Sequence, residues 1–191
     1  IKKILVGHSW GAFCVLNAVS EEGISGAVAM CGFISGAKVL AQNTVGKKVP
    51  FLTFLAEGFL RLFNRLRFGR NANKNCLKSL RNADKPVYLI YGTADKTVYY
   101  KKNGAVLERK LRNFKNIHCK ICEGRAHNPY LTIRAEREMC QTFSAISEQK
   151  KKDKKRILSM YAEINYERIT EEDPEIMRSI IDFCDRVAEN G

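Results

Sequence analysis

The feature that most constrains this chain is a Gly-x-Ser-x-Gly pentapeptide at residues 7–11, between two apolar segments. Residues 4–6 before it have the composition of a buried strand, and the Ala- and Leu-containing run after it is compatible with a helix. A strand that turns sharply into a helix brings the two elements close together and strains the central residue. Gly7 and Gly11 are expected to avoid side-chain collisions there. The alternative, a chance pentapeptide in a loop, does not account for the strand and helix around it.

This turn makes Ser9 a candidate nucleophile. It also directs the backbone N–H of Trp10, at the start of a helix, toward the space above the Ser9 hydroxyl. A developing oxyanion is stabilised by such an N–H group and by the helix dipole. A serine hydroxyl reacts poorly, however, until a base accepts its proton and an acid orients that base.

Two further strands end in residues of the required types. The run 85–92 leads into Asp95, and the run 116–122 leads into His127. The carboxyl ends of parallel strands meet at one rim of a sheet, where ligand sites form. The chain order Ser9, Asp95, His127 is the one expected for a triad built on this kind of sheet.

The other candidates for acid and base are less well placed. His8 lies inside the pentapeptide, where we expect its side chain to point away from the neighbouring hydroxyl, and His118 lies within a predicted strand. Asp84 precedes its strand and should lie at the opposite end of the sheet. His127 and Asp95 are therefore the predicted base and acid.

At these motifs the chain resembles the α/β-hydrolase superfamily, and within it the serine aminopeptidase, lysophospholipase and esterase-like branch. The matching segments are residues 7–11, 92–95 and 124–129, and the resemblance covers residues 1–148. It implies an α/β fold of parallel strands with flanking helices and a helical cap insertion at about 34–84. It also implies a serine hydrolase that forms an acyl-enzyme on an ester or thioester and needs no cofactor or metal.

The chain departs from the family at its beginning. Residue 1 lies in the strand that feeds the turn, so the first strands of the family, and the loop that donates a second oxyanion N–H, have no counterpart. We therefore expect a C-terminal portion of the fold, whose open first strand is covered by a missing segment or another chain.

Within the predicted cap, residues 49–63 form an amphipathic pattern. Its apolar face predicts either a roof over the site or ordinary core packing, and a roof would favour a hydrophobic acyl substrate. Arg61, Arg65, Arg67 and Arg70 in and after this run favour a solvated face over an anion site.

Beyond residue 148 we expect a basic connector and C-terminal helices that pack on the core. The last helix should begin at Asp173 and Pro174, with Met177, Ile180, Ile181 and Cys184 at core spacing.

The formal net charge is +13, from 33 Lys and Arg against 20 Asp and Glu. Much of the excess is concentrated at residues 150–156 without interleaved aromatic residues, which favours a solvated connector over a nucleic-acid surface. Association of this run with an anionic membrane is a further alternative.

Seven cysteines, mostly in apolar runs, are typical of reduced, buried thiols in a cytoplasmic protein. Cys119 and Cys122 form a C-x-x-C pair, but strand geometry would place them on opposite faces, which argues against a metal or redox site. No apolar run is long enough to cross a membrane.

Three other functions stay open at this stage. A peptidase or an acyltransferase would use the same acyl-enzyme step, and a non-catalytic binding protein could retain the same pocket.

Overall fold

The computed structural model describes residues 1–46, 48–149 and 153–189. Its centre is a parallel sheet in the order β1-β2-β3-β4, which confirms the predicted α/β class. The strands are β1 (Ile4–His8), β2 (Gly26–Met30), β3 (Val87–Gly92) and β4 (Ile117–Cys122). Because all four run in the same direction, their carboxyl ends form one rim.

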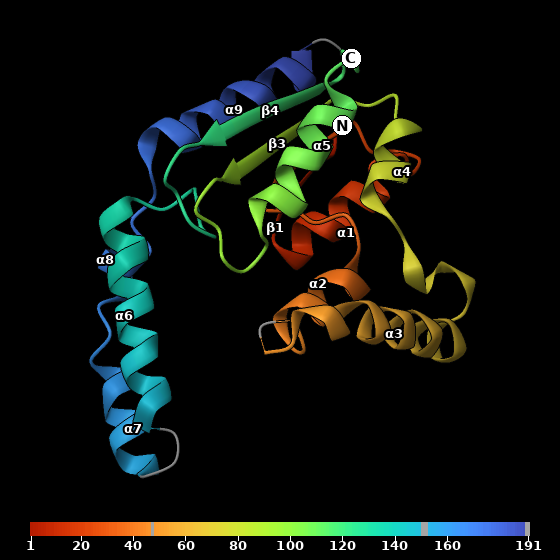
Figure 1. The fold of residues 1–191 in the computed structure, drawn as a ribbon. Coiled ribbons are helices and arrows are strands. Elements are labelled where there is room, and N and C mark those ends of the chain that lie inside the picture. The colour runs from red at the N-terminus through yellow and green to blue at the C-terminus, as the bar shows by residue number, and fades with distance from the viewer. Residues whose placement is uncertain (47, 150–152, 190–191) are drawn as a thin grey trace.

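Helices cover both faces of this sheet (Figure 1). One face packs against α1 (Trp10–Ala18), α4 (Cys76–Arg81) and α5 (Gly104–Leu111), which follows the short helix η3 (Tyr100–Lys102). The other face packs against α9 (Pro174–Glu189). The described core thus has three layers.

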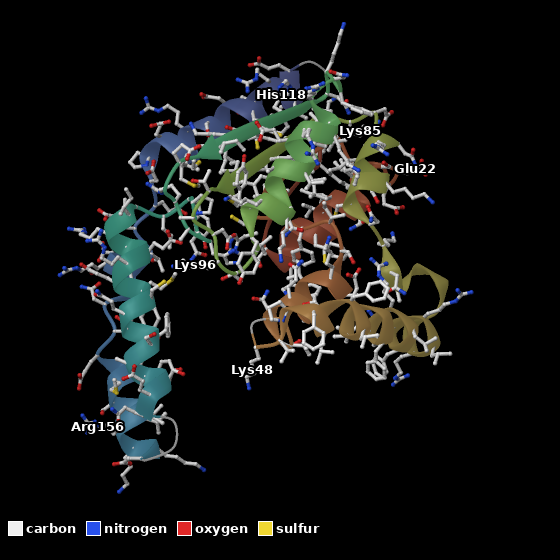
Figure 2. The ribbon with its side chains drawn as sticks, viewed as in Figure 1. Glu22, Lys48, Lys85, Lys96, His118 and Arg156 are labelled. Atoms are coloured by element: carbon white, nitrogen blue, oxygen red, sulfur yellow. The ribbon has the colours of Figure 1, made fainter. Side chains whose placement is uncertain are left out.

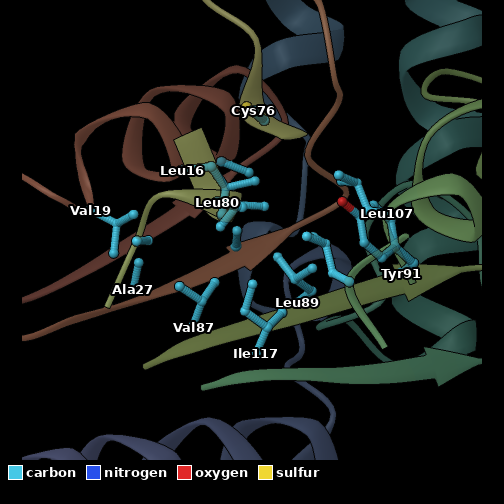
Figure 3. Packing of buried hydrophobic residues seen from close by; sticks show 14 residues of the cluster. Leu16, Val19, Ala27, Cys76, Leu80, Val87, Leu89, Tyr91, Leu107 and Ile117 are labelled. Carbon is cyan, nitrogen blue, oxygen red and sulfur yellow. The ribbon is translucent and has the colours of Figure 1, made fainter. Parts of the chain in front are cut away.

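The larger core cluster lies between the sheet and α1, α4 and α5 (Figure 3). Leu16, Leu80, Leu89 and Leu107 are completely buried in it. Each such leucine contributes about 1.5–3 kcal/mol by burial relative to an exposed one.

Helix α9 packs through one face, as its sequence spacing predicts. Asp173 caps it, because one carboxylate oxygen accepts hydrogen bonds from the N–H groups of Glu175 (3.0 Å) and Ile176 (3.2 Å). Ile180 and Phe183 are buried against β2, β3 and β4, whereas Ile181 is exposed to solvent. The prediction of Ile181 as a core residue is therefore wrong.

The segment 34–84 contains two different parts. The first comprises α2 (Gly36–Asn43), η1 (Pro50–Leu52), α3 (Thr53–Phe68) and η2 (Arg70–Asn73), and α3 packs on α2. The second, α4, places Cys76 and Leu80 in the main core. The structural core therefore resumes at α4, before the predicted end of the insertion.

The apolar face of the amphipathic helix is exposed. The exposed fraction is 80% for Phe51, 64% for Leu55, 67% for Phe59 and 57% for Leu62. No described residue of α3 is buried. Core packing of this face, one of the two sequence interpretations, is therefore wrong for the described part of the chain.

A helical arm follows the last strand. It is formed by α6 (Ile133–Gln149), α7 (Lys154–Ala162) and α8 (Tyr166–Ile169) and projects away from the sheet (Figure 1). In the predicted connector, residues 150–152 lie outside the described part. Asp153 caps α7 by accepting hydrogen bonds from the N–H groups of Lys155 and Arg156, so the end of the basic run is helical.

The basic side chains are spread over the molecule. Figure 2 shows Lys48, Lys85, Lys96 and Arg156 in separate parts of the molecule. Among the described helices, none combines the length and the apolar composition that a bilayer crossing requires.

All seven cysteines are free thiols, of which Cys31, Cys76 and Cys122 are buried and Cys14, Cys119 and Cys140 are exposed. The prediction of mostly buried thiols is thus wrong for several of them. Cys119 and Cys122 differ in burial, as expected for opposite faces of β4, and do not form a paired site.

Candidate functional site

The turn between β1 and α1 has the predicted strain. Ser9 adopts φ 55° and ψ −113°, a conformation that residues with a side chain rarely occupy. The Ser9 N–H donates to the carbonyl of Met30 (2.9 Å), which ties the turn to the end of β2.

The two glycines of the motif have different roles. A Cβ at Gly7 would overlap the backbone carbonyl of Gly11 and lie 2.8 Å from the nitrogen of Ala12. A Cβ at Gly11 would meet nothing within 4 Å. The steric explanation therefore holds for Gly7 and is wrong for Gly11, whose backbone is the surface that Gly7 approaches.

Asp95 lies just beyond β3 and is 5% exposed. Its Oδ1 accepts hydrogen bonds from the N–H groups of Thr97 (2.7 Å) and Val98 (2.8 Å). These two donors compensate the cost of burying the carboxylate and fix its orientation. Its second oxygen, Oδ2, faces the loop that carries His127.

The structure brings the three predicted side chains together at the rim. Asp95 Oδ2 lies 2.7 Å from His127 Nδ1, and His127 Nε2 lies 3.0 Å from Ser9 Oγ. Because a carboxylate can only accept, the imidazole Nδ1–H donates to Asp95. The Nε2 atom of the neutral ring then carries a lone pair that faces the serine hydroxyl.

His8 anchors the segment that carries His127. Its Nε2–H donates to the backbone carbonyl of His127 (2.7 Å), and the two ring centroids lie 4.7 Å apart. Burial lowers the pKa of His8, and the hydrogen bond to the His127 carbonyl only partly offsets this. This role of His8 could not be predicted, because nothing in the pentapeptide indicates a partner so far along the chain.

Arg125 forms a second anchor. Its Nη2 donates to the carbonyls of Pro129 (3.0 Å) and Leu131, and the same atom lies 3.0 Å from Asp173 Oδ2. The N–H of Asp173 donates to the carbonyl of Tyr130 (2.8 Å). The start of α9 is therefore joined directly to the segment that follows β4.

Trp10 is the first residue of α1 and is 47% exposed. Its ring packs edge-on against Phe33, with centroids 4.8 Å apart. Beside it lies a pocket of about 290 Å³ that α2, α3 and the η2 region also line. Its apolar walls include Trp10, Phe13, Leu40 and Phe68, so α3 contributes to a hollow next to the turn even though most of its apolar residues face solvent.

One group of side chains near the site has the composition of a metal site. His8, Cys31 and His127 offer ligand atoms within 4.8 Å of one another. Burial raises the pKa of the Cys31 thiol, and the nearby Asp95 carboxylate raises it further, which opposes the thiolate that a metal would need. Both histidines also hold hydrogen bonds within the site, so this group fits a polar cluster better than a metal centre.

No family model matches the sequence, and the search of curated proteins found no relative. Among solved structures, the chain is similar to an esterase from Pyrococcus furiosus, at 19% identity and a TM-score of 0.47, over 77% of this chain and 53% of that one. It is also similar to the acylaminoacyl peptidase of Pyrococcus horikoshii, at 16% identity and a TM-score of 0.46, over 65% of this chain and 19% of that one. A puromycin-hydrolyzing peptidase of Mycobacterium tuberculosis matches at 18% identity and a TM-score of 0.46, over 65% and 18% of the two chains.

The chain spans about half the length of the esterase and about a fifth of each peptidase. It has the α/β architecture that its motifs predict for a member of the α/β-hydrolase superfamily, with the loops of Ser9, Asp95 and His127 at one rim of a parallel sheet.

Proposed function

We propose that this protein is a serine hydrolase that cleaves a carboxylic ester or thioester through an acyl-enzyme. The observation that carries the proposal is the hydrogen-bonded series from Asp95 Oδ2 through the His127 ring to Ser9 Oγ, with separations of 2.7 and 3.0 Å. An aligned acid, base and hydroxyl are what nucleophilic catalysis by serine requires.

In the first half of the reaction, His127 Nε2 accepts the Ser9 proton while Oγ attacks the carbonyl carbon. Asp95 stabilises the resulting imidazolium and holds its orientation. His127 then transfers the proton to the leaving oxygen or sulfur as its bond to carbon breaks. Water repeats the sequence on the acyl-enzyme, releasing the acid and returning the proton to Ser9.

The oxyanion needs donors as well as the triad. We assign one of them to the N–H of Trp10, the first residue of α1. In the family that the motifs resemble, the second donor belongs to a loop that precedes the nucleophile turn. Loss of one such donor typically costs about 10²–10³ in kcat.

The pocket beside Trp10 favours an apolar acyl group. Its lining by Phe13, Leu40 and Phe68 matches the character of sites for hydrophobic ligands, and α3 would act as part of a cap over the bound group. A peptidase or an acyltransferase uses the same first half-reaction, and these two alternatives differ in the leaving group and in the acceptor of the acyl group.

The test is labelling of the whole protein with a fluorophosphonate probe. We expect covalent labelling that Ser9→Ala abolishes, together with a fall in ester hydrolysis of about 10⁴-fold or more. Ser20→Ala, at an exposed position after α1, is the matched control and should label normally. Equal labelling of Ser9→Ala and the wild type, or no labelling of either, would exclude the hydrolase and favour a binding protein.

Substrate series distinguish the remaining alternatives. Acyl esters of increasing chain length, the corresponding anilides, and an added alcohol or amine acceptor report on esterase, peptidase and acyltransferase activity respectively.

A further inference from the structure

A third anchor of the His127 segment comes from the helical arm. Glu136 lies in the first turn of α6 and is 7% exposed. Its Oε1 accepts a hydrogen bond from the N–H of Asn128 (2.6 Å), and its Oε2 accepts one from the N–H of Ala126 (3.3 Å). The two donors are the residues immediately before and after His127.

This arrangement constrains the backbone on both sides of the imidazole. A carboxylate that binds two N–H groups fixes the orientation of both peptide planes, and hydrogen bonds to a charged acceptor are stronger than those between neutral groups. Burial makes the bonds costly to break, because the carboxylate would lose its only described partners in a site of limited water access. Glu136 is also near the N-terminus of α6, where a negative charge is favoured.

We propose that Glu136 is a positioning residue for His127, and that its carboxylate holds the imidazole in register with both Ser9 and Asp95. The proposal rests on the proposed function of the site. Within the described residues, both hydrogen bonds of the Glu136 carboxylate go to backbone N–H groups, so Glu136 acts through His127 and not on the substrate.

Such an anchor matters because the reaction tolerates only small displacements of the reacting groups. Both ring nitrogens of His127 must stay within hydrogen-bond distance of their partners, and a displacement of about 1 Å in a reacting group can cost about 10²-fold in rate. His8 holds the carbonyl of His127, while Glu136 holds the amides on either side. Together they leave the segment little freedom to rotate.

The first experiment is Glu136→Gln in the whole protein. A glutamine has one accepting oxygen, and its NH₂ group would face one of the two N–H donors. We expect kcat for an ester, and the rate of fluorophosphonate labelling, to fall by about 10- to 100-fold, while KM changes by less than about 2-fold. The matched control is Glu148→Gln, an exposed position on the same helix, which should leave both rates unchanged.

Two measurements separate positioning from a general loss of stability. Hydrogen exchange at the amides of Ala126 and Asn128 should accelerate in Glu136→Gln while exchange in the strands is unchanged. The low-field proton resonance of His127 Nδ1–H should shift or broaden, because it reports the bond to Asp95. A purely structural role would lower the unfolding temperature without changing kcat of the folded protein or this resonance.

Glu136→Asp keeps the inference testable if the glutamine variant does not fold. It retains two carboxylate oxygens at a shorter reach, so an intermediate loss of kcat is expected. A folded Glu136→Gln or Glu136→Asp protein with wild-type kcat and an unchanged His127 resonance would overturn the proposal. If the wild type itself does not label, the proposed function fails, whereas the exchange and resonance measurements still test the anchor.

Discussion

Helix α3 and the segment that carries His127 differ sharply in how they are held in place. Residues 123–132 receive hydrogen bonds or ion pairs from three separate elements: His8 in β1, Glu136 in α6 and Asp173 at the start of α9. Helix α3 has no buried described residue, and Phe54 and Leu66 at its surface are 80% and 78% exposed.

The two regions differ in what fixes their position. The His127 segment is short and polar, and its backbone groups are satisfied by buried partners, so its geometry is specified to within the tolerance of a hydrogen bond. Helix α3 packs on α2 and η2 and Arg61 Nη2 donates to the Ser35 hydroxyl, but none of its described residues is buried. Local stability follows buried contacts, so substitutions in the two regions should differ greatly in effect.

Among the polar contacts of the His127 segment, the largest expected effect on stability is that of Arg125→Met. The side chains of Arg125 and Asp173 are only 13% and 20% exposed, so removal of the cation leaves a largely buried carboxylate unpaired. We expect unfolding in denaturant to show a loss of about 3 kcal/mol, at the lower end for a broken buried pair because Asp173 keeps its cap bonds to α9.

Arg134→Met is the matched control for this ion pair. Its pair with Glu171 has side-chain exposures of 59% and 45%, and its loss should cost less than about 1 kcal/mol. Equal losses in the two variants would show that α9 does not anchor the His127 segment.

A smaller effect is expected at His8. Burial lowers its pKa below the ordinary 6.5, so the folded protein resists protonation that the unfolded chain accepts. The stabilising contribution of neutral His8 is therefore complete above about pH 6.5 and is lost as the pH falls toward the lowered value. His8→Gln retains a donor for the His127 carbonyl but does not titrate, so its stability should fall less between pH 7.5 and pH 5.

His8→Phe, which removes the donor and also does not titrate, should cost about 1 kcal/mol at pH 7.5 and less at pH 5, where wild-type His8 has lost part of its contribution. A wild-type pH profile in His8→Gln would contradict the assignment of the slope to this residue.

The smallest effect on stability is expected in α3. Phe59→Ser replaces a residue that is 67% exposed by one of similar helix propensity, so the free energy of unfolding should change by less than about 0.5 kcal/mol. Leu107→Ala in α5, where the leucine is completely buried, is the contrasting variant and should cost about 2–5 kcal/mol. A loss above 2 kcal/mol for Phe59→Ser would mean that the apolar face of α3 is covered in solution.

Much of the architecture was predictable from local sequence. The strands β1, β3 and β4 were expected within about two residues of their observed bounds, because runs of β-formers end at Gly, Pro or polar residues. The approach of Ser9, Asp95 and His127 followed from the geometry of parallel strands. Their catalytic roles are still a proposal.

Other features could not be predicted from the same patterns. An amphipathic run specifies an apolar face but not what covers it, so the exposure of Phe51 and Phe59 was open. The three anchors of His127 were also missed, since His8, Glu136 and Asp173 lie far apart in the chain and carry no shared periodicity.

The sequence by itself determined the strained turn at Ser9, the parallel strands and the order of the three rim residues, because these depend on steric limits and repeats within a few residues. Only the tertiary structure decided which distant side chains hold the His127 segment, that α4 belongs to the core and that the apolar face of α3 meets solvent. Those outcomes depend on packing and on the satisfaction of buried polar groups between segments, which no local pattern encodes.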